Sequence, residues 1–301
     1  LEVCRRLQMP AVLTAGATDL WNWRLKDAAG PWELSDMDLL TSLTGTSTER
    51  TFHMVPCAMQ AAAAKVVPKL FLADVLVRGS RDRQLAALLR ELKDLLARFK
   101  EIFAQIHHGV DVSTFYDVYR PLLEGFFPAG ILLQGESVVP EGVPFLSQTE
   151  PGADGGGALL NQSKGPSAGQ STILLIDAFL GVSHCKPGAD FQAEMLTYMP
   201  ALHRQMVLDY RERWADVEGV PQFVRRRQAA GGEEAPALVE AFHGCVLALR
   251  DLRRFHLSTV SRYLTRTNTG TGASAWRKLL QAMLDNTEAV CPFSMPSEKS
   301  N

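Results

Sequence analysis

The chain has 301 residues, of which 46% are hydrophobic and 21% are charged, proportions that are ordinary for a globular protein. With 31 basic and 33 acidic residues the formal net charge is −2, which excludes a strongly basic surface for nucleic acid or for an anionic membrane. We therefore expect its partners to be small molecules, with no nucleic acid and no membrane among them.

The longest apolar stretch and the cysteines exclude two further classes of protein. Residues 171–182 are too short to cross a bilayer, and Asp177 interrupts them. The cysteines are odd in number and include no CxxC pair, which argues against a disulfide scaffold and a zinc cage. They are Cys4, Cys57, Cys185, Cys245 and Cys291. We expect a monomeric protein in the reducing environment of the cytoplasm.

The spacing of apolar residues predicts helices along most of the chain. In chain order these cover residues 36–43, 50–76, 84–106, 112–126, 171–183, 189–212, 236–266 and 274–290. The pattern is clearest over 84–106, where apolar residues recur at steps of three and four, and over 236–266, which begins at a proline suited to a first helical turn. Since strand-like alternation is scarce, the predicted fold class is all-α, a bundle of long helices.

Two segments rich in glycine separate these helices. Residues 128–170 also contain many prolines and serines, and they are far longer than a normal helix connection. Loops of this length are usually functional or disordered. A shorter glycine-rich stretch, residues 267–274, follows the helix predicted over 236–266.

His256 lies on the apolar stripe of the helix predicted over 236–266, which aims its imidazole into the core. The stripe steps by four residues from Leu252 to His256, and by four again to Val260. On spacing alone, the commoner interpretation is a core histidine that hydrogen-bonds to a neighbouring group. The alternative is a metal or haem ligand, since neutral imidazole often binds iron in proteins.

Two features favour haem over a metal site built from protein ligands alone. Arg253 and Arg254 precede His256 and Arg262 follows it, which supplies counter-charges for haem propionates. The sequence has no HExxH motif and no histidines four residues apart, so a second protein ligand is not evident. A single buried histidine suits five-coordinate haem b, which the absence of CxxCH leaves without thioether bonds.

Five short motifs resemble those of the indoleamine 2,3-dioxygenases and stand in the same order. They are FYDVYR at 115–120, SAGQS at 167–171, YMPALHR at 198–204, LRRFHLSTVSRY at 252–263 and GTGAS at 270–274. The similarity extends from about residue 7 to residue 290. It implies a haem-dependent dioxygenase that inserts both atoms of O2 into the indole C2–C3 bond of tryptophan or a related indoleamine. The product would be N-formylkynurenine, the first intermediate of the kynurenine pathway.

The resemblance assigns roles to residues around a haem. His256 matches the proximal ligand of the iron, which leaves the opposite face open to O2. Phe52, Phe115 and Tyr116 match the aromatic walls that hold the indole ring, with Tyr116 in place of a phenylalanine of animal members. Arg120 matches the arginine that binds the substrate carboxylate, for which the guanidinium fork is well suited.

The remaining matches shape or close the same pocket. Leu123 matches a pocket residue, and Thr271, between Gly270 and Gly272, matches a threonine in a mobile loop that closes over the substrate. The small residues of the family that approach the distal side of the haem are matched by Ser167, Ala168 and Gly169.

Asp177 lies inside an apolar run and must be paired if it is ionised. Arg253 is its predicted partner. Under the resemblance, the two would anchor a haem propionate and the helix that carries the proximal ligand.

The match is imperfect at Pro56 and at the amino end. Pro56 stands where animal members have a small polar residue and related enzymes a histidine, so no side-chain base is assigned there. His53, about one turn earlier, is a candidate substitute. Family members begin with a smaller helical domain, and we expect the chain, which starts at Leu1, to be truncated. Residues 1–35 would be the tail of that domain with a linker, and 36–301 the haem-binding catalytic domain.

Two other interpretations compete with a dioxygenase. Pro56 and the short amino end also fit a non-catalytic haem protein, derived from this family, that binds O2 reversibly. In the third interpretation the chain is a helical scaffold without a cofactor, and His256 is merely buried.

Overall fold

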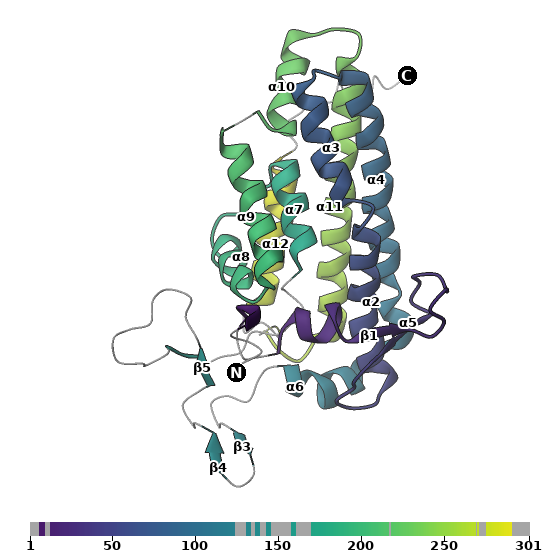
Figure 1. The fold of residues 1–301 in the computed structure, drawn as a ribbon, viewed down its shortest axis with the longest axis vertical. Helices are drawn as coiled ribbons and strands as arrows, with labels where there is room; N and C mark the ends of the chain where they lie inside the picture. The colour runs from purple at the N-terminus through teal and green to yellow at the C-terminus, as the bar shows by residue number, and fades with distance from the viewer. Residues whose placement is uncertain are drawn as a thin grey trace.

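The computed structural model describes residues 6–9, 13–123, 170–216, 218–268, 270 and 275–290, together with the backbone of four short strands between residues 131 and 160. Long helices dominate it, which confirms the all-α prediction (Figure 1). Among these residues, no helix combines the length and apolar character needed to cross a bilayer.

The two longest helices, α4 (Asp82–Ala104) and α11 (Ala235–Tyr263), form the spine of the bundle. They lie side by side over much of their length (Figure 1). Their facing stripes are those that the spacing predicted, and Leu89 and Leu249 are fully buried. The Cys245 thiol donates to the carbonyl oxygen of Leu89 across the seam at 3.0 Å. Apolar burial of this kind contributes roughly 1.5–3 kcal/mol for each large side chain.

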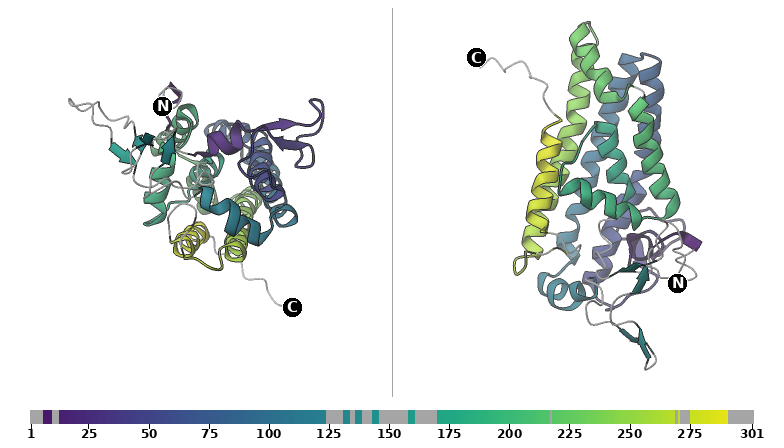
Figure 2. Two further views of the ribbon diagram at one scale, coloured as in Figure 1. Left: turned by 90° about the horizontal axis from the view of Figure 1, so that it is seen from below. Right: turned by 90° about the vertical axis from the view of Figure 1, so that its left-hand side faces the viewer.

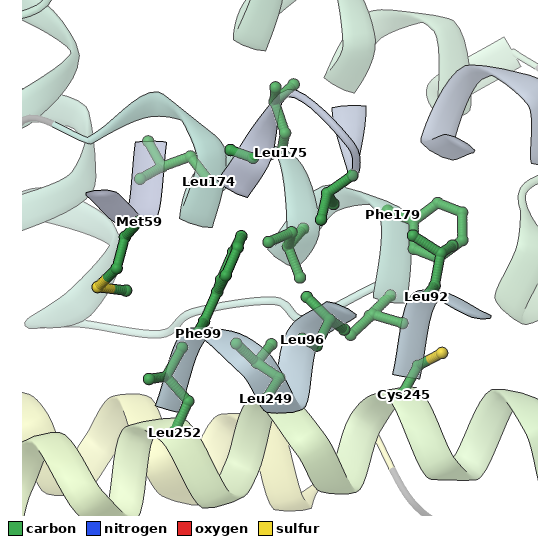
Figure 3. Packing of buried hydrophobic residues seen from close by; sticks show 14 of the residues in the cluster. Met59, Leu92, Leu96, Phe99, Leu174, Leu175, Phe179, Cys245, Leu249 and Leu252 are labelled. Atoms are coloured by element: carbon green, nitrogen blue, oxygen red, sulfur yellow. The ribbon is translucent and has the colours of Figure 1, made fainter. Parts of the chain in front are cut away.

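The other helices pack around this pair. They are α2 (Ser47–Ala63), α3 (Val67–Arg78), α5 (Ile106–Gly109), α6 (Arg120–Leu123), α7 (Ser171–Leu180), α8 (Gly188–Thr197), α9 (Ala201–Asp216), α10 (Val220–Ala230) and α12 (Trp276–Glu288). Figure 2 shows α12 beside α11 and the α7–α9 group on another side of the bundle. In the core between α4 and α7, Phe99 and Leu96 of α4 face Leu174 and Leu175 of α7 (Figure 3).

Short strands occur as antiparallel pairs. Strand β1 (Trp23–Leu25) pairs with β2 (Met37–Leu39). Within the segment predicted as a loop, strands pair in the same way: β3 (Ile131–Leu133) with β4 (Glu136–Val138), and β5 (Val143–Phe145) with β6 (Ala158–Leu160).

The helix predicted over 36–43 is wrong, because residues 37–39 form β2. Met37 and Leu39 are buried while Asp38 between them is half-buried, the alternation of a strand. Asp38 accepts a hydrogen bond from Nε of Arg50 at 3.1 Å, which ties the hairpin to α2. In so short a segment, two apolar residues fit either periodicity, and pairing with β1 decides for the strand.

Other predicted helices differ from the structure in their bounds. The helix over 50–76 is two helices, and Pro68 lies in the first turn of α3. The helix over 189–212 is also two, since α8 ends before Pro200 and α9 begins after it. The helix over 112–126 begins as a π-helix, η2 (Thr114–Tyr119), and continues as α6.

Helix α10 was not predicted, because its apolar stripe is short. Only Val220, Pro221, Phe223 and Val224 are buried, and three arginines follow them. With so few apolar residues, the period of 3.6 does not stand out in the sequence.

Glu49 fixes the start of α2, the helix that leads into the site. Its side chain is 2% exposed and accepts hydrogen bonds from the backbone amides of Leu43 and Thr44 at 2.7 Å. Thr46 caps the helix by accepting from the Glu49 amide at 3.2 Å. Burial alone would raise the pKa of Glu49, but the hydrogen bonds to Ser42, Thr44 and the backbone lower it. Residues 42–49 therefore set the position of the helix that carries Phe52.

We predict that Asp74 of α3 makes the protein less stable as pH rises. Burial raises its pKa to about 6 from 3.8, although Arg213 and Tyr210 partly offset the effect. Because the carboxyl group binds its proton more tightly in the folded state, protonation of Asp74 stabilises the fold. This contribution is fully present below about pH 4 and is lost as pH rises through about 6. At about 1.4 kcal/mol per pH unit, the wild type should lose roughly 2 kcal/mol more than Asp74→Asn between pH 4 and pH 7.5. Urea unfolding at pH 4 and pH 7.5 measures the difference, and parallel losses in both proteins would contradict it.

Candidate functional site

A cavity of about 320 Å³ lies among α2, α4, η2, α7, α8, α11 and α12, at the lower end of the size range of small-molecule sites. Its lining is mostly apolar. Six of the residues singled out in the sequence line it, namely Phe52, Pro56, Phe115, Arg253, His256 and Gly270. The structure therefore brings together residues that lie up to 218 positions apart in the sequence, from Phe52 to Gly270.

The other singled-out residues fall into two groups. Tyr116, Arg120, Leu123 and Asp177 are not among the described residues that line the cavity. Five more lie outside the described residues, namely Ser167, Ala168, Gly169, Thr271 and Gly272. Gln170 and Gly270, which follow and precede these residues in the sequence, both line the cavity.

His256 projects from α11 to the cavity wall. Its side chain is half-buried, and the ring of Phe103 packs against it edge-on with centroids 5.5 Å apart. Among the described residues, no hydrogen bond to either ring nitrogen is found. Burial, aided by the positive charge of Arg253, lowers the pKa of His256 to about 4. The imidazole is therefore neutral at pH 7, the form that binds a metal.

His256 thus has no hydrogen-bond partner in the described part of the chain. It does not fit the interpretation of a core histidine that is paired with a neighbour. In the same part, no group of three or more His, Cys, Asp or Glu side chains is placed to hold a metal ion. One imidazole on an apolar wall matches the ligand number of five-coordinate haem better than that of a site built from protein ligands.

Phe52 and Phe115 form an aromatic wall of the cavity. Their ring centroids are 5.0 Å apart with the planes tilted by 34°. Phe115 also meets Tyr263 of α11 edge-on at 5.8 Å. Phe115 is carried by η2, and π-helical turns often occur at functional sites. Flat apolar rings of this kind can pack against another aromatic ring.

Arg120 and Tyr116 lie beside this wall rather than on it. Arg120 is 7% exposed, and its guanidinium carbon lies 5.3 Å from the centroid of the Tyr116 ring. The guanidinium of Arg266 is 5.2 Å from the same ring. Leu123, one turn after Arg120, is fully buried in the core. Two cations therefore contact the ring of Tyr116 beside the aromatic wall.

Asp177 and Arg253 form the predicted ion pair, which is buried. Nη2 of Arg253 donates to both carboxylate oxygens at 2.6 and 2.7 Å, and Nη1 donates to the hydroxyl of Thr287. His184 and Gln192 also contact Oδ2 of Asp177, at 2.9 and 3.1 Å. Burial alone would raise the pKa of Asp177, but the charge of Arg253 and the hydrogen bond from His184 lower it. This network joins α7, α8, α11 and α12 next to His256.

Pro56 and His53 differ in where they face. Pro56 lies inside α2 and lines the cavity, where it offers no donor. His53 is buried, and both its ring nitrogens are engaged, Nδ1 with Asp19 at 2.5 Å and Nε2 with the hydroxyl of Tyr119. It therefore does not substitute for a side chain at the position of Pro56.

Several lining residues were not singled out in the sequence. Phe103, Leu252 and Val260 belong to apolar stripes that predicted burial, but a stripe does not separate core positions from cavity positions. Thr259 and Tyr263 were not assigned a role in the site either, although both fall inside the motif around His256. Their contacts with His107, at 3.2 and 3.3 Å, link α11 to α5 below the cavity wall.

The chain is similar in sequence to known proteins. A family model described as indoleamine 2,3-dioxygenase matches residues 1–289. Indoleamine 2,3-dioxygenase 2 of Mus musculus is 28% identical, and the match covers 97% of this chain and 71% of the mouse protein. The 6-hydroxytryptophan 2,3-dioxygenase of Fusarium equiseti is 28% identical over 90% of this chain and 62% of its own length. A myoglobin of Haliotis madaka is 25% identical over 96% and 71%.

We predict that Asp177→Ala destabilises the protein by about 3–5 kcal/mol, because it leaves the Arg253 charge buried without its partner. The matched control is Glu218→Ala, which breaks an exposed pair in which Arg226 donates two hydrogen bonds, at 2.6 and 2.7 Å. Exposed pairs contribute about 0–1 kcal/mol. Urea unfolding measures the free energy of unfolding of both variants, and an equal decrease in the two would contradict the prediction.

Proposed function

The chain belongs to the indoleamine 2,3-dioxygenase family, and from this premise we propose that it is a haem-dependent dioxygenase of tryptophan or a related indoleamine. The reaction would insert both atoms of O2 into the indole C2–C3 bond and give N-formylkynurenine, at the start of the kynurenine pathway. The observation that carries the proposal is His256, a neutral imidazole without a hydrogen-bond partner in the described part of the chain, on the wall of a mostly apolar cavity.

The residues around the cavity fit haem b. His256 would be the proximal ligand of the iron, and the apolar lining suits the faces of the macrocycle. Bound haem would supply the oxygen chemistry, which protein side chains do not provide. Arg253 reaches the cavity but is already paired with Asp177, which supports a role of the pair in fixing α11. A contact of Arg253 with a propionate, and of Gly169 with the haem, remain predictions.

The chain's own residues would bind and orient the substrate. Phe52 and Phe115 would hold the indole ring, and Tyr116 and Leu123 would shape its surroundings. Arg120 would bind the carboxylate from its place beside the aromatic wall, through a charge-assisted hydrogen bond. Ser167 and Ala168 would border the distal side, and Thr271 would close over the substrate. No side-chain base is assigned, since Pro56 has none to offer.

Two findings favour a second candidate, a non-catalytic haem protein that binds O2 reversibly. Pro56 lines the cavity and has no side-chain donor to offer. One relative is a myoglobin by name. A stable oxygenated form that tryptophan does not alter would favour this candidate over the dioxygenase. We further propose that the protein acts in the cytoplasm as a monomer.

Haem titration tests the first requirement of the proposed function, which is that the protein binds haem through His256. We expect the wild type to bind haem with a Soret band typical of histidine ligation, and His256→Ala to lose most of this binding. His243→Ala is the matched control, because His243 is on the same helix and is not among the described lining residues. Reduced wild-type protein should then form N-formylkynurenine only when tryptophan is present. A normal haem spectrum without product would refute the dioxygenase.

We predict that Arg120→Leu raises the KM for tryptophan by about 10- to 100-fold, since a charge-assisted hydrogen bond contributes roughly 1.5–3 kcal/mol. The increase in KM should vanish with tryptamine, which has the indole ring but no carboxylate. Steady-state kinetics with both substrates provides the measurement. An equal increase in KM for the two substrates would mean that Arg120 supports the pocket without binding the carboxylate.

A further inference from the structure

A buried chain of three polar side chains lies directly behind the aromatic wall of the cavity. Asp19 comes from the π-helical turn η1 (Gly16–Leu20), His53 from α2 and Tyr119 from the end of η2. Each is at most 2% exposed. Nδ1 of His53 lies 2.5 Å from Oδ1 of Asp19, and Nε2 is hydrogen-bonded to the Tyr119 hydroxyl. We refer to Asp19, His53 and Tyr119 as the polar triad.

The members of the polar triad satisfy one another. Burial raises the pKa of Tyr119, so its hydroxyl keeps its proton and can donate. With a neutral imidazole, Nδ1–H donates to Asp19 and the Tyr119 hydroxyl donates to Nε2, so each group has a partner. A buried polar group that loses its partner is costly, so the three side chains hold three separate segments together.

Both phenylalanines of the wall pack against the polar triad. The Phe52 ring meets the His53 ring edge-on at 5.3 Å and the Tyr119 ring at 5.7 Å. Phe115 is four residues before Tyr119 in η2, with its ring centroid 6.5 Å from that of Tyr119. A shift of Tyr119 relative to His53 would therefore change the angle between the two rings of the wall.

We propose that the polar triad is a positioning device for the substrate wall. It ties η1 and η2 to α2 and so fixes the arrangement in which Phe52 and Phe115 receive the aromatic ring of the substrate. The triad is not among the described residues that line the cavity, so it acts through the two phenylalanines. The inference rests on the proposed function for the identity of the substrate.

Tyr119→Phe tests the proposal in the haem-loaded protein, because it keeps the ring and removes only the hydroxyl. We expect the Kd for tryptophan, measured from the change in the Soret spectrum of the ferric protein, to rise about 3- to 10-fold. The haem content and the spectrum without tryptophan should stay those of the wild type. Tyr210→Phe is the matched control, because its hydroxyl is also buried and hydrogen-bonds to Asp74 at 3.5 Å, away from the lining.

Asp19 provides a second test at the far end of the polar triad, which also serves if Tyr119→Phe does not fold. Asp19→Ala removes the acceptor for Nδ1 and should weaken tryptophan binding in the same direction. Asp19→Asn keeps an oxygen that can accept from Nδ1–H, so it should restore most of the affinity. Asp19→Leu has a similar bulk but no acceptor, so it should not restore the affinity, and restored affinity in this variant would mean that only the bulk of the side chain matters.

The outcomes separate this inference from the proposed function. Unchanged Kd values in Tyr119→Phe and Asp19→Ala, or an equal rise in Tyr210→Phe, would overturn the positioning role while leaving wild-type turnover intact. If the wild type binds tryptophan but forms no product, the dioxygenase fails and the binding data still decide on the polar triad. If the wild type neither binds nor converts tryptophan, both are overturned.

Discussion

The ion pair between Asp177 and Arg253 is the contact on which the geometry of the site depends. Its partners come from α7 and α11, and the added contacts of His184, Gln192 and Thr287 bring in α8 and α12. Because a buried charge must stay with its partner, these elements cannot move apart independently. The turn of α11 that carries His256 follows directly from Arg253, so the ion pair also fixes the direction of the imidazole.

The cavity owes its character to a second constraint, the close packing of α4 against α11. Leucines of both helices are buried along this seam, and Phe103 of α4 and His256 of α11 both line the cavity, with their ring centroids 5.5 Å apart. Close-packed cores leave few voids. A cavity of this size, lined by apolar side chains and one neutral imidazole, is therefore an unusual feature of the core.

The sequence predicted what local periodicity encodes. The stripes of α4 and α11 located both helices and placed His256 on the inward face, whereas Met37 and Leu39 fitted a helix or a strand equally well. The pairing of Asp177 with Arg253 followed from the cost of a buried charge, and the structure contains it. The polar triad could not be predicted, because Asp19 and Tyr119 are 34 and 66 residues from His53 and only the fold brings them together.

Pro56 has a consequence for the backbone as well as for the side-chain chemistry of the wall. An α-helix pairs each carbonyl with the amide four residues later, and proline has no amide hydrogen. The carbonyl of Phe52 therefore lacks its usual helical donor, in the same turn that presents Phe52 and Pro56 to the cavity. Replacing Pro56 by serine would change two things at once, adding a hydroxyl and restoring a backbone hydrogen bond. Any comparison of this wall with one that carries serine is thus a comparison of helix geometry too.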